Sequence, residues 1–241
     1  MSQKMGFSFI RRAATGNVLS LSAVSFLNDL SSEMLYPLLP AFFAGLTGPG
    51  TAALYVGLMD GVAESVASLL KYYSGKLSDS LGVRKPLAVL GYSISTAVRP
   101  VMALVSHSWQ VVALRVVDRV GKGVRTSPRD ALLSESISED VRGAAFGLHR
   151  MADHAGAMFG PIAALIFLGI LLGGKGLWIL KEGVSSEEQI LALRYLFAFC
   201  CLPGFASVVV LAFCVREIAP EKVRSYPAKG SLQIDRSKPS L

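Results

Sequence analysis

The stretch that decides the fold is short, polar and basic: Tyr73-Ser-Gly75-Lys-Leu77-Ser-Asp79-Ser-Leu-Gly82-Val-Arg84-Lys85-Pro86. Long apolar runs flank it on both sides, which is the pattern of two membrane helices that meet at a tight reversal. Gly75 permits close packing at the end of the incoming helix, and Gly82 permits the positive φ that a sharp helix exit needs. Asp79 lies within reach of Arg84 and Lys85 at the start of the next helix. The stretch therefore predicts a charge-clamped hairpin at the membrane surface.

This hairpin resembles the signature loop between helices 2 and 3 of the major facilitator superfamily, commonly written G-x-L-x-D-x-x-G-x-[RK]-[RK]. The matching positions are Gly75, Leu77, Asp79, Gly82, Arg84 and Lys85. The resemblance implies a gating role for the loop. It also implies that Asp130, further along the chain, is the partner of Arg84 in a charge relay. The alternative is a generic membrane hairpin with positive charges on its cytoplasmic side.

Composition places the chain in a membrane. It has 241 residues, of which 52% are hydrophobic and only 17% are charged, so the excess apolar surface must face lipid. The net charge of +7 would suit nucleic acid, but the Lys and Arg residues are spread over loops and helix ends. Cys200, Cys201 and Cys214 share one apolar run and offer no disulfide framework. No signal peptide is recognisable, so we expect the first apolar run to remain in the protein.

Six apolar runs are long enough to cross a hydrocarbon core of about 30 Å as helices. They are residues 17–44, 52–75, 86–105, 110–133, 143–172 and 190–215. We therefore expect an all-α membrane protein, with residues 1–16 as a basic N-terminus, 17–215 as a six-helix transmembrane bundle and 216–241 as a disordered tail. Pro37 and Pro40 predict a break in the first span. The family resemblance implies one bundle of two inverted three-helix repeats, with a tail that resembles the start of the superfamily's central loop.

Basic residues cluster in the connections that would share one side of the membrane. They are Lys4, Arg11, Arg12, Lys76, Arg84, Lys85, Arg142, Arg216, Lys222, Arg224, Lys229, Arg236 and Lys238. The connections on the opposite side carry few basic residues, and the two lysines in the longest of them are accompanied by acidic residues. Because cytoplasmic loops are enriched in Lys and Arg, we expect both termini to be cytoplasmic, in a bacterial inner membrane.

Ionisable residues recur inside the predicted spans, although each is costly there. Asp29 and Glu33 are four residues apart, as are Asp60 and Glu64, so each pair shares one helix face. The other candidates for a substrate or proton pathway are Arg99, Arg115, Arg119, Asp153 and His154. Their depth predicts a shared polar cavity, with Asp29, Glu33 and Asp60 as candidate proton carriers. The alternative is a set of internal ion pairs that only fix helix packing.

Two further patterns resemble the superfamily. The string that starts at Arg115 is similar to its R-x-x-x-x-x-G-x-G pattern on helix 4, which implies a part for Arg115 in proton coupling. The string Gly156-Ala-Met-Phe-Gly160-Pro161 looks like a shortened G-x-x-x-G-P element of helix 5. The spacing of these two glycines by itself predicts close packing between helices, followed by a bend at the proline.

These patterns predict secondary active transport of a small solute by alternating access, coupled to protons. We expect no enzyme activity, cofactor, metal site or nucleic-acid partner; the expected partners are lipid and the solute. Because members of the superfamily usually contain two bundles, we expect a truncated chain, a second six-helix half or a homodimer mate. One alternative is a non-transporting membrane scaffold or partner subunit. Another is an intramembrane hydrolase that uses His149 or His154, although G-x-S-x-G and H-E-x-x-H motifs are missing.

Overall fold

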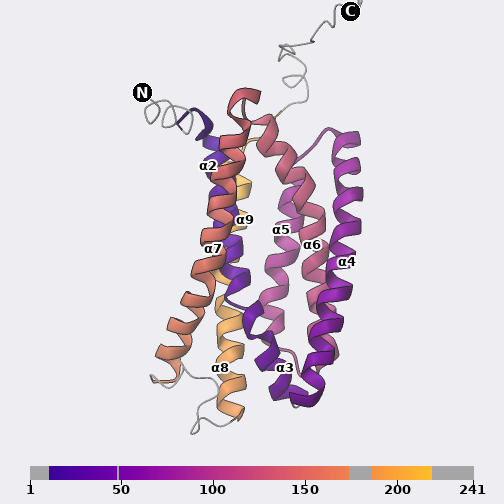
Figure 1. Ribbon diagram of the computed structural model, residues 1–241, viewed down its shortest axis with the longest axis vertical. Coiled ribbons are helices and arrows are strands. Elements are labelled where there is room, and N and C mark those ends of the chain that lie inside the picture. The colour runs from indigo at the N-terminus through magenta and orange to yellow at the C-terminus, as the bar shows by residue number, and fades with distance from the viewer. Residues whose placement is uncertain (1–10, 48, 174–185, 219–241) are drawn as a thin grey trace, which may run out of the picture.

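Every regular element in the described part of the chain is helical, and the long helices lie side by side along one axis (Figure 1). The computed structural model describes residues 11–47, 49–173 and 186–218. The expectation of an all-α protein is confirmed for these residues. α2 begins and α9 ends at the same end of the bundle, which we call the terminal end.

The predicted spans correspond to helices, two of which are interrupted. The elements are α2 (Gly16–Glu33), η1 (Tyr36–Leu38), α3 (Leu39–Thr47), α4 (Pro49–Leu81), α5 (Lys85–Met102), α6 (Ser108–Glu135), η2 (Glu139–Val141), α7 (Arg142–Leu171), α8 (Ser186–Phe199) and α9 (Cys201–Cys214). Within the described residues, three helical stretches are long and apolar enough to cross a membrane: Ala52–Leu81, Glu139–Leu171 and Glu187–Cys214. α6 is not among them because charged side chains run along most of its length.

Prolines account for both interruptions. α2 ends at Glu33, and Pro37 lies in the first turn of η1 before α3 begins, so the predicted break in the first span is present. In the last span, α8 ends at Phe199 and α9 begins at Cys201. Pro203 has no N–H to donate to the Phe199 carbonyl, which opens the helix at this point.

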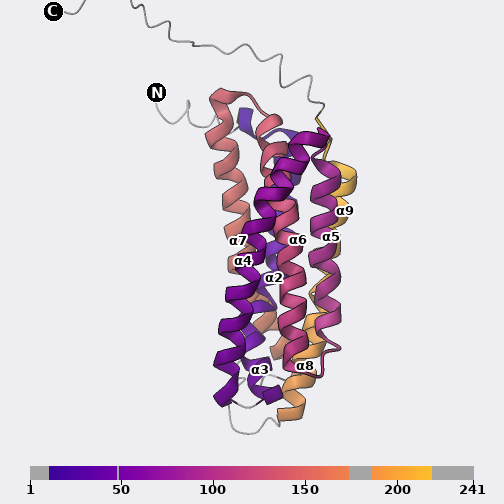
Figure 2. The ribbon, with the colours of Figure 1, turned by 90° about the vertical axis from the view of Figure 1, so that its right-hand side faces the viewer.

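The long helices of the described chain pack around α2 and α6. α2 contacts both α7 and α9, α6 contacts both α4 and α5, and the contact between α5 and α9 joins these two sets of helices (Figure 2). Glycines permit the closest approaches. An added Cβ at Gly156 would overlap the carbonyl oxygen of Phe26 on α2, and one at Gly160 would lie 2.7 Å from Cβ of Glu33. Pro161 continues α7 without ending it.

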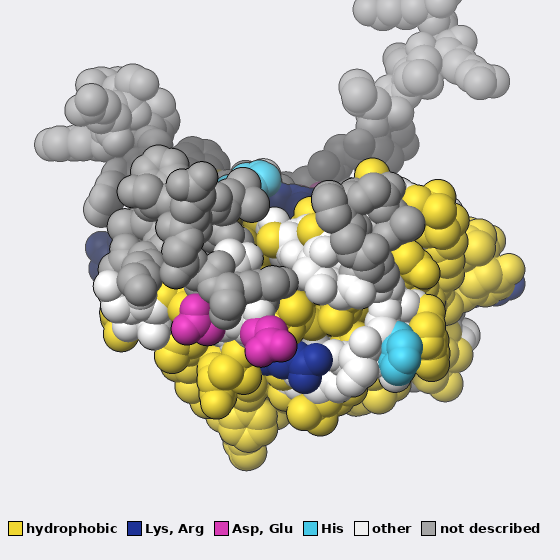
Figure 3. All heavy atoms as spheres, turned by 90° about the horizontal axis from the view of Figure 1, so that it is seen from below, with side chains coloured by type: hydrophobic (Ala, Val, Ile, Leu, Met, Phe, Trp, Pro, Cys, Tyr) yellow, Lys and Arg dark blue, Asp and Glu magenta, His cyan; other side chains and the backbone are white. Residues whose placement is uncertain are grey.

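Two apolar clusters fill the interior, one in each half of the bundle. The cluster away from the termini includes Phe42, Phe43 and Phe197, whereas the terminal-end cluster includes Leu21 and Leu132. Many large apolar side chains are also exposed. In the view along the axis from the end opposite the termini, hydrophobic side chains dominate the visible flanks of the bundle (Figure 3). This surface is what helices in contact with lipid require.

Candidate functional site

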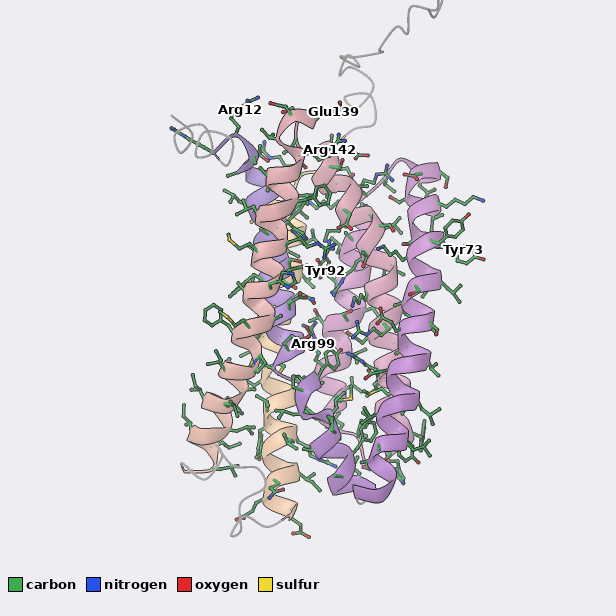
Figure 4. All side chains as sticks on the ribbon, in the orientation of Figure 1. Arg12, Tyr73, Tyr92, Arg99, Glu139 and Arg142 are labelled. Atoms are coloured by element: carbon green, nitrogen blue, oxygen red, sulfur yellow. The ribbon has the colours of Figure 1, made fainter. Side chains whose placement is uncertain are left out.

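Buried polar and charged side chains lie between the two apolar clusters, across the middle of the bundle. We call this set the polar belt; the buried members that concern us are Ser25, Asn28, Ser31, Arg99, Arg115, Asp118, Arg125, Arg129, His149 and Asp153. They come from α2, α5, α6 and α7. Arg99 and Tyr92 both point into the interior from α5 (Figure 4). Because lipid offers these groups no hydrogen bonds, their partners must come from the protein or from water.

Asn28 joins two buried arginines. Its Oδ1 accepts hydrogen bonds from Nη2 of Arg99 at 2.7 Å and from Nη1 of Arg125 at 2.9 Å. Its Nδ2 donates to Asp29 at 2.9 Å, and Nη1 of Arg99 also donates to Ser31 at 2.5 Å. Among the described residues, no carboxylate lies within ion-pair distance of Arg99 or Arg125. Neutral oxygens therefore hold two buried positive charges, an arrangement that is costly to maintain.

Ion pairs between α4 and α6 bring together residues that the sequence analysis selected. Nη2 of Arg115 lies 3.7 Å from Asp60, and Nη1 of Arg119 lies 3.7 Å from Glu64. Arg115 is also 3.6 Å from Asp118. These separations are too long for hydrogen bonds. The carboxylates of Asp60 and Glu64 are 59% and 61% exposed, so they lie on an open face of α4.

Tyr36 lies against this group of charges. The guanidinium carbon of Arg115 is 3.5 Å from the centre of the Tyr36 ring, a cation–π contact, and that of Arg119 is 5.8 Å away. The Tyr36 hydroxyl and the Nε atoms of both arginines are buried without a hydrogen-bond partner in the described chain. Glu33 is partly exposed at the end of α2. Several donors here are therefore available to another group.

Ser25 connects three helices on the terminal side of the belt. Its hydroxyl donates to Oδ1 of Asp153 on α7 and accepts from Nη1 of Arg129 on α6 at 3.3 Å. Nε2 of His149 lies 3.5 Å from the same hydroxyl. Arg129 also donates to Asp130 at 2.9 and 3.0 Å. The second oxygen of Asp153 faces Arg150 on its own helix, whereas His154 is exposed.

The turn at the terminal end has much shorter ion pairs. Gly82 has the predicted positive φ, at 66°, and ends the helix. Nη1 of Arg84 donates to Asp79 at 2.5 Å and to Ser78 at 2.7 Å, while Nη2 donates to Glu135 at 3.0 Å. Burial alone would lower the pKa of Arg84, but its hydrogen bonds to Glu135 and Asp79 outweigh burial and raise it.

Two expectations about this turn are wrong. Arg84 pairs with Glu135 on α6 and not with Asp130, whose carboxylate is taken by the adjacent Arg129. α6 continues past the predicted end at residue 133, which brings Glu135 to the turn. Gly75 does not end the incoming helix, since α4 continues to Leu81. The close packing expected at Gly75 is present, since an added Cβ would lie 3.2 Å from Cβ of Ser127 on α6.

Glu217 covers the start of α5. Its carboxylate accepts hydrogen bonds from the backbone N–H of Arg84 at 3.0 Å and of Lys85 at 2.7 Å, where a helix N-terminus favours negative charge. The backbone N–H of Arg216 donates to Asn17 at 2.9 Å. The expected disordered tail therefore does not begin at residue 216, because residues 216 and 217 bond to the bundle. The rest of that tail, 219–241, lies outside the described residues.

The sequence analysis left several residues of the belt and the turn out of the predicted pathway and gate: His149, Arg129, Glu135 and Glu217. A signal for Arg129 was present. The spacing of three and four residues that links Arg115, Arg119 and Lys122 continues through Arg125 to Arg129, along one face of α6. The partners of Glu217 lie more than 130 residues away in the chain, so local spacing gives no signal for it.

Membrane-length helices packed around ionised side chains define an integral membrane protein of the α-helical class. The chain belongs to the Major Facilitator Superfamily, whose profile matches residues 21–239. The resemblance drawn from the signature turn is thereby confirmed. The family and the solved structures that the chain resembles are transporters, not enzymes.

Among its relatives is the uncharacterized MFS-type transporter MJ1317 of Methanocaldococcus jannaschii, 40% identical over 158 residues, or 65% of this chain and 38% of that protein. An uncharacterized protein of Mycobacterium tuberculosis is 35% identical over 76% of this chain and 42% of its own length. The multidrug resistance protein MdtH of Cronobacter sakazakii is 28% identical over 65% of this chain and 42% of its own length. The chain thus spans about two fifths of the length of these relatives.

A bacterial homolog of the human lysosomal transporter Spinster, in an inward-facing and occupied conformation, has the same fold. The TM-score is 0.67 at 18% identity, and the match covers 83% of this chain and 44% of that chain. At this identity the likeness concerns the fold alone.

Proposed function

We propose that the chain carries out secondary active transport of a small solute by alternating access, coupled to protons, as one six-helix half of a transporter. In this proposal residues 17–215 form the transmembrane half, 1–16 precede it, and 216–241 begin the connection to a second half. The solute and proton pathway consists of the sequence-selected residues Asp29, Glu33, Asp60, Glu64, Arg99, Arg115, Arg119, Asp153 and His154. The turn at Gly82 and Arg84 has the gating role.

The observation that carries the proposal is the exposure of Asp60 and Glu64 in the middle of α4. This helix is apolar enough to cross a membrane, and its other exposed side chains include Leu58 and Val62. A carboxylate that faced lipid at this depth would cost about 2.5–3.5 kcal/mol. This face of α4 therefore meets water or another protein surface, as the lining of a solute pathway does.

The helix contacts support two inverted repeats. If the first three spans are exchanged with the last three, the α2–α7 contact maps onto the α4–α6 contact, and the α2–α9 contact maps onto the α5–α6 contact. The α5–α9 contact maps onto itself. A pseudo-two-fold axis through the bundle accounts for this pairing, as in transporters built from inverted repeats.

Charge placement supports cytoplasmic termini in a bacterial inner membrane. Arg12 pairs with Asp140 and Arg84 contacts Glu217, so basic residues from distant parts of the chain gather at the terminal end. Arg12 and Arg142 both lie at that end (Figure 4). Because basic loops remain on the cytoplasmic side, the terminal end is assigned to the cytoplasm.

A second bundle is the expected partner of the α4 face. Either a separate six-helix half or a second copy of this chain would cover Asp60 and Glu64 and enclose a pathway with them. The competing role is a non-transporting scaffold. Arg99 favours it, since all of its hydrogen-bond partners lie inside the bundle.

Thiol labelling tests the pathway. Asp60→Cys and Glu64→Cys are made in a background without the native cysteines and treated with a membrane-impermeant maleimide from each side. Val62→Cys is the matched control, because it lies two residues from each and so on the opposite helix face. We expect both pathway cysteines to react and Val62→Cys not to react. Resistance of both pathway cysteines from either side would reject a solute pathway here and leave the scaffold role.

Solute movement is tested with ethidium, a cationic probe chosen because some relatives are named multidrug resistance proteins. The complete gene product is reconstituted into liposomes with a pH difference across the membrane. We expect ethidium movement that stops when an ionophore removes the pH difference. Movement that persists without the pH difference would refute proton coupling.

A further inference from the structure

The polar belt contains a buried histidine that the proposed pathway does not use. The chain has three histidines, of which His107 and His154 are exposed, whereas His149 is 1% exposed. His149 lies on α7, about 10 Å along the helix from its start at Arg142. Its Nδ1 atom is buried and has no hydrogen-bond partner in the described chain. Since an unpaired buried polar atom is costly, this position needs an explanation.

Ser25 links this ring to the surface of the helix. Nε2 of His149 lies 3.5 Å from the Ser25 hydroxyl, which donates to Oδ1 of Asp153. The other oxygen of Asp153 lies 3.4 Å from Nη1 of Arg150, whose side chain is exposed. A hydrogen-bonded line therefore runs from the buried imidazole, through one hydroxyl, to a carboxylate beside the exposed side of α7.

The charges around His149 balance when its ring is neutral. Arg129 and Asp130 face it from α6, and Arg150 and Asp153 from its own helix. On α2 the contact is the uncharged Ser25, and the next carboxylate along that helix is Asp29, which lies near Asp153. Two positive and two negative charges thus surround the ring. A proton on His149 adds a positive charge that is balanced only by moving a proton elsewhere.

We propose, on the basis of the proton-coupled transport proposed above, that His149 binds the coupled proton and passes it to Asp153 through Ser25. The protonated ring gives its Nε2 proton to the Ser25 oxygen as the hydroxyl proton of Ser25 moves to Oδ1 of Asp153. His149 becomes neutral, Ser25 keeps one proton, and Asp153 becomes a carboxylic acid. Neutral Asp153 no longer attracts Arg150, so the transfer alters the charge at the contact between α2 and α7.

Histidine titration tests proton binding without reference to any solute. The complete protein is labelled with ¹⁵N at the histidine rings, placed in lipid nanodiscs and followed by NMR between about pH 3 and about pH 8, a range that extends below the ordinary histidine transition because burial disfavours the charged ring. His107→Gln and His154→Gln assign the exposed rings. We expect the His149 signals to titrate, and Asp153→Asn and Ser25→Ala to shift that midpoint by at least about half a pH unit without moving the others.

A His149 ring whose signals stay constant over this range overturns the proposal. A midpoint that is unaffected by both Asp153→Asn and Ser25→Ala also overturns it, because the ring would then not exchange with Asp153. The titration uses the wild-type residue, so it remains decisive even if a variant at position 149 does not fold.

Ethidium movement then connects the site to coupling. His149→Gln is expected to lower pH-driven movement at least about tenfold, or ~1.4 kcal/mol in activation free energy, whereas the control His107→Gln, at an exposed histidine outside the proposed pathway, retains it. Equal movement in both variants would overturn the role of His149. If wild-type protein moves no ethidium, the transport proposal fails, and the ring titration alone decides whether His149 exchanges protons with Asp153.

Discussion

Arg84 at the terminal-end turn and Arg119 on α6 are equally buried but differently bonded. Each side chain is 15% exposed. Arg84 donates hydrogen bonds of 2.5–3.0 Å to two carboxylates. Arg119 lies 3.7 Å from Glu64, and its Nε is buried without a partner in the described chain. Burial alone therefore does not determine how firmly a charge is held in this bundle.

The difference in ion-pair distance distinguishes the firmly bonded Arg84 from Arg119, whose pairing with Glu64 is loose. Arg84 forms an ion pair with Glu135, which is only 16% exposed. Because Arg84 also pairs with Asp79, its guanidinium connects α4 and α6 at the start of α5. Glu64, the partner of Arg119, is 61% exposed and can be solvated without it. We infer that the turn, as a gate, stabilises this conformation of the bundle, whereas the ion pairs between α4 and α6 can open for a solute or a proton.

The largest effect on stability is expected from Arg84→Gln. This change leaves Glu135 charged and mostly buried. Removing one partner of an ion pair that lies near the surface should lower the free energy of unfolding by about 2 kcal/mol. For a protein of this size the midpoint of thermal unfolding in detergent should fall by about 4–8 °C. Lys85→Gln is the matched control at the same turn. The hydrogen bond of Lys85 to Glu217 comes from its backbone N–H, so the substitution removes a charge and keeps that bond. A fall of the same size in both variants would contradict the special role of Arg84.

Arg119→Gln should show the opposite behaviour. Its partner is mostly solvated, so the loss of stability should stay below about 1 kcal/mol. Movement of ethidium driven by a pH difference should nevertheless fall about tenfold, since the pathway loses a charge that pairs with Glu64. The comparison would fail if Arg119→Gln unfolded the protein as readily as Arg84→Gln, or if transport were unaffected. Both quantities are measured on the same reconstituted preparation.

Helix positions could be read from the sequence because lipid imposes one simple requirement. A run of about 20 apolar residues satisfies its own backbone hydrogen bonds only as a helix, so apolar length alone predicts the spans. The positive φ of Gly82 and the break near Pro37 are equally local, because each follows from one residue's backbone chemistry. The extension of α4 to Leu81 was missed because the span was ended where the apolar run ends, although Gly82 marks the helix end.

Partners across the bundle were harder to predict. The sequence predicted that Asp60 and Arg115 line one polar cavity, and they lie 3.7 Å apart. The family resemblance, however, paired Arg84 with Asp130 and not with Glu135. Five residues separate these two acids, more than one turn of α6, and the choice depends on where that helix ends. Similarly, His154 and His149 are both on α7, and the packing of neighbouring helices on one side of α7 buries His149.

A smaller effect is expected where the chain after α9 meets the turn. Glu217→Gln removes the negative charge from the N-terminus of α5 but keeps the length of the side chain. Loss of this favourable interaction with the helix dipole and the two backbone N–H groups should cost about 0.5–1 kcal/mol. We expect the effect to shrink at high salt, because the site is exposed. Arg216→Gln is the control, since its backbone bond to Asn17 is retained; a larger loss there would place the anchor at residue 216.

The smallest effect is expected at Asp140 in η2, which forms an exposed ion pair with Arg12. The Ser138 hydroxyl, and then Arg12, hold the pKa of Asp140 below its ordinary value. A carboxyl whose pKa is lower in the folded protein stabilises the fold above its unfolded pKa of about 3.9, and this contribution is lost as pH falls through the folded value. The thermal midpoint of Asp140→Asn should therefore lie slightly below wild type near pH 7 and converge with it as the pH falls below about 3. A difference that grew on acidification would mean that Asp140 is destabilising as an anion, and the exposed pair with Arg12 would then contribute nothing to the fold.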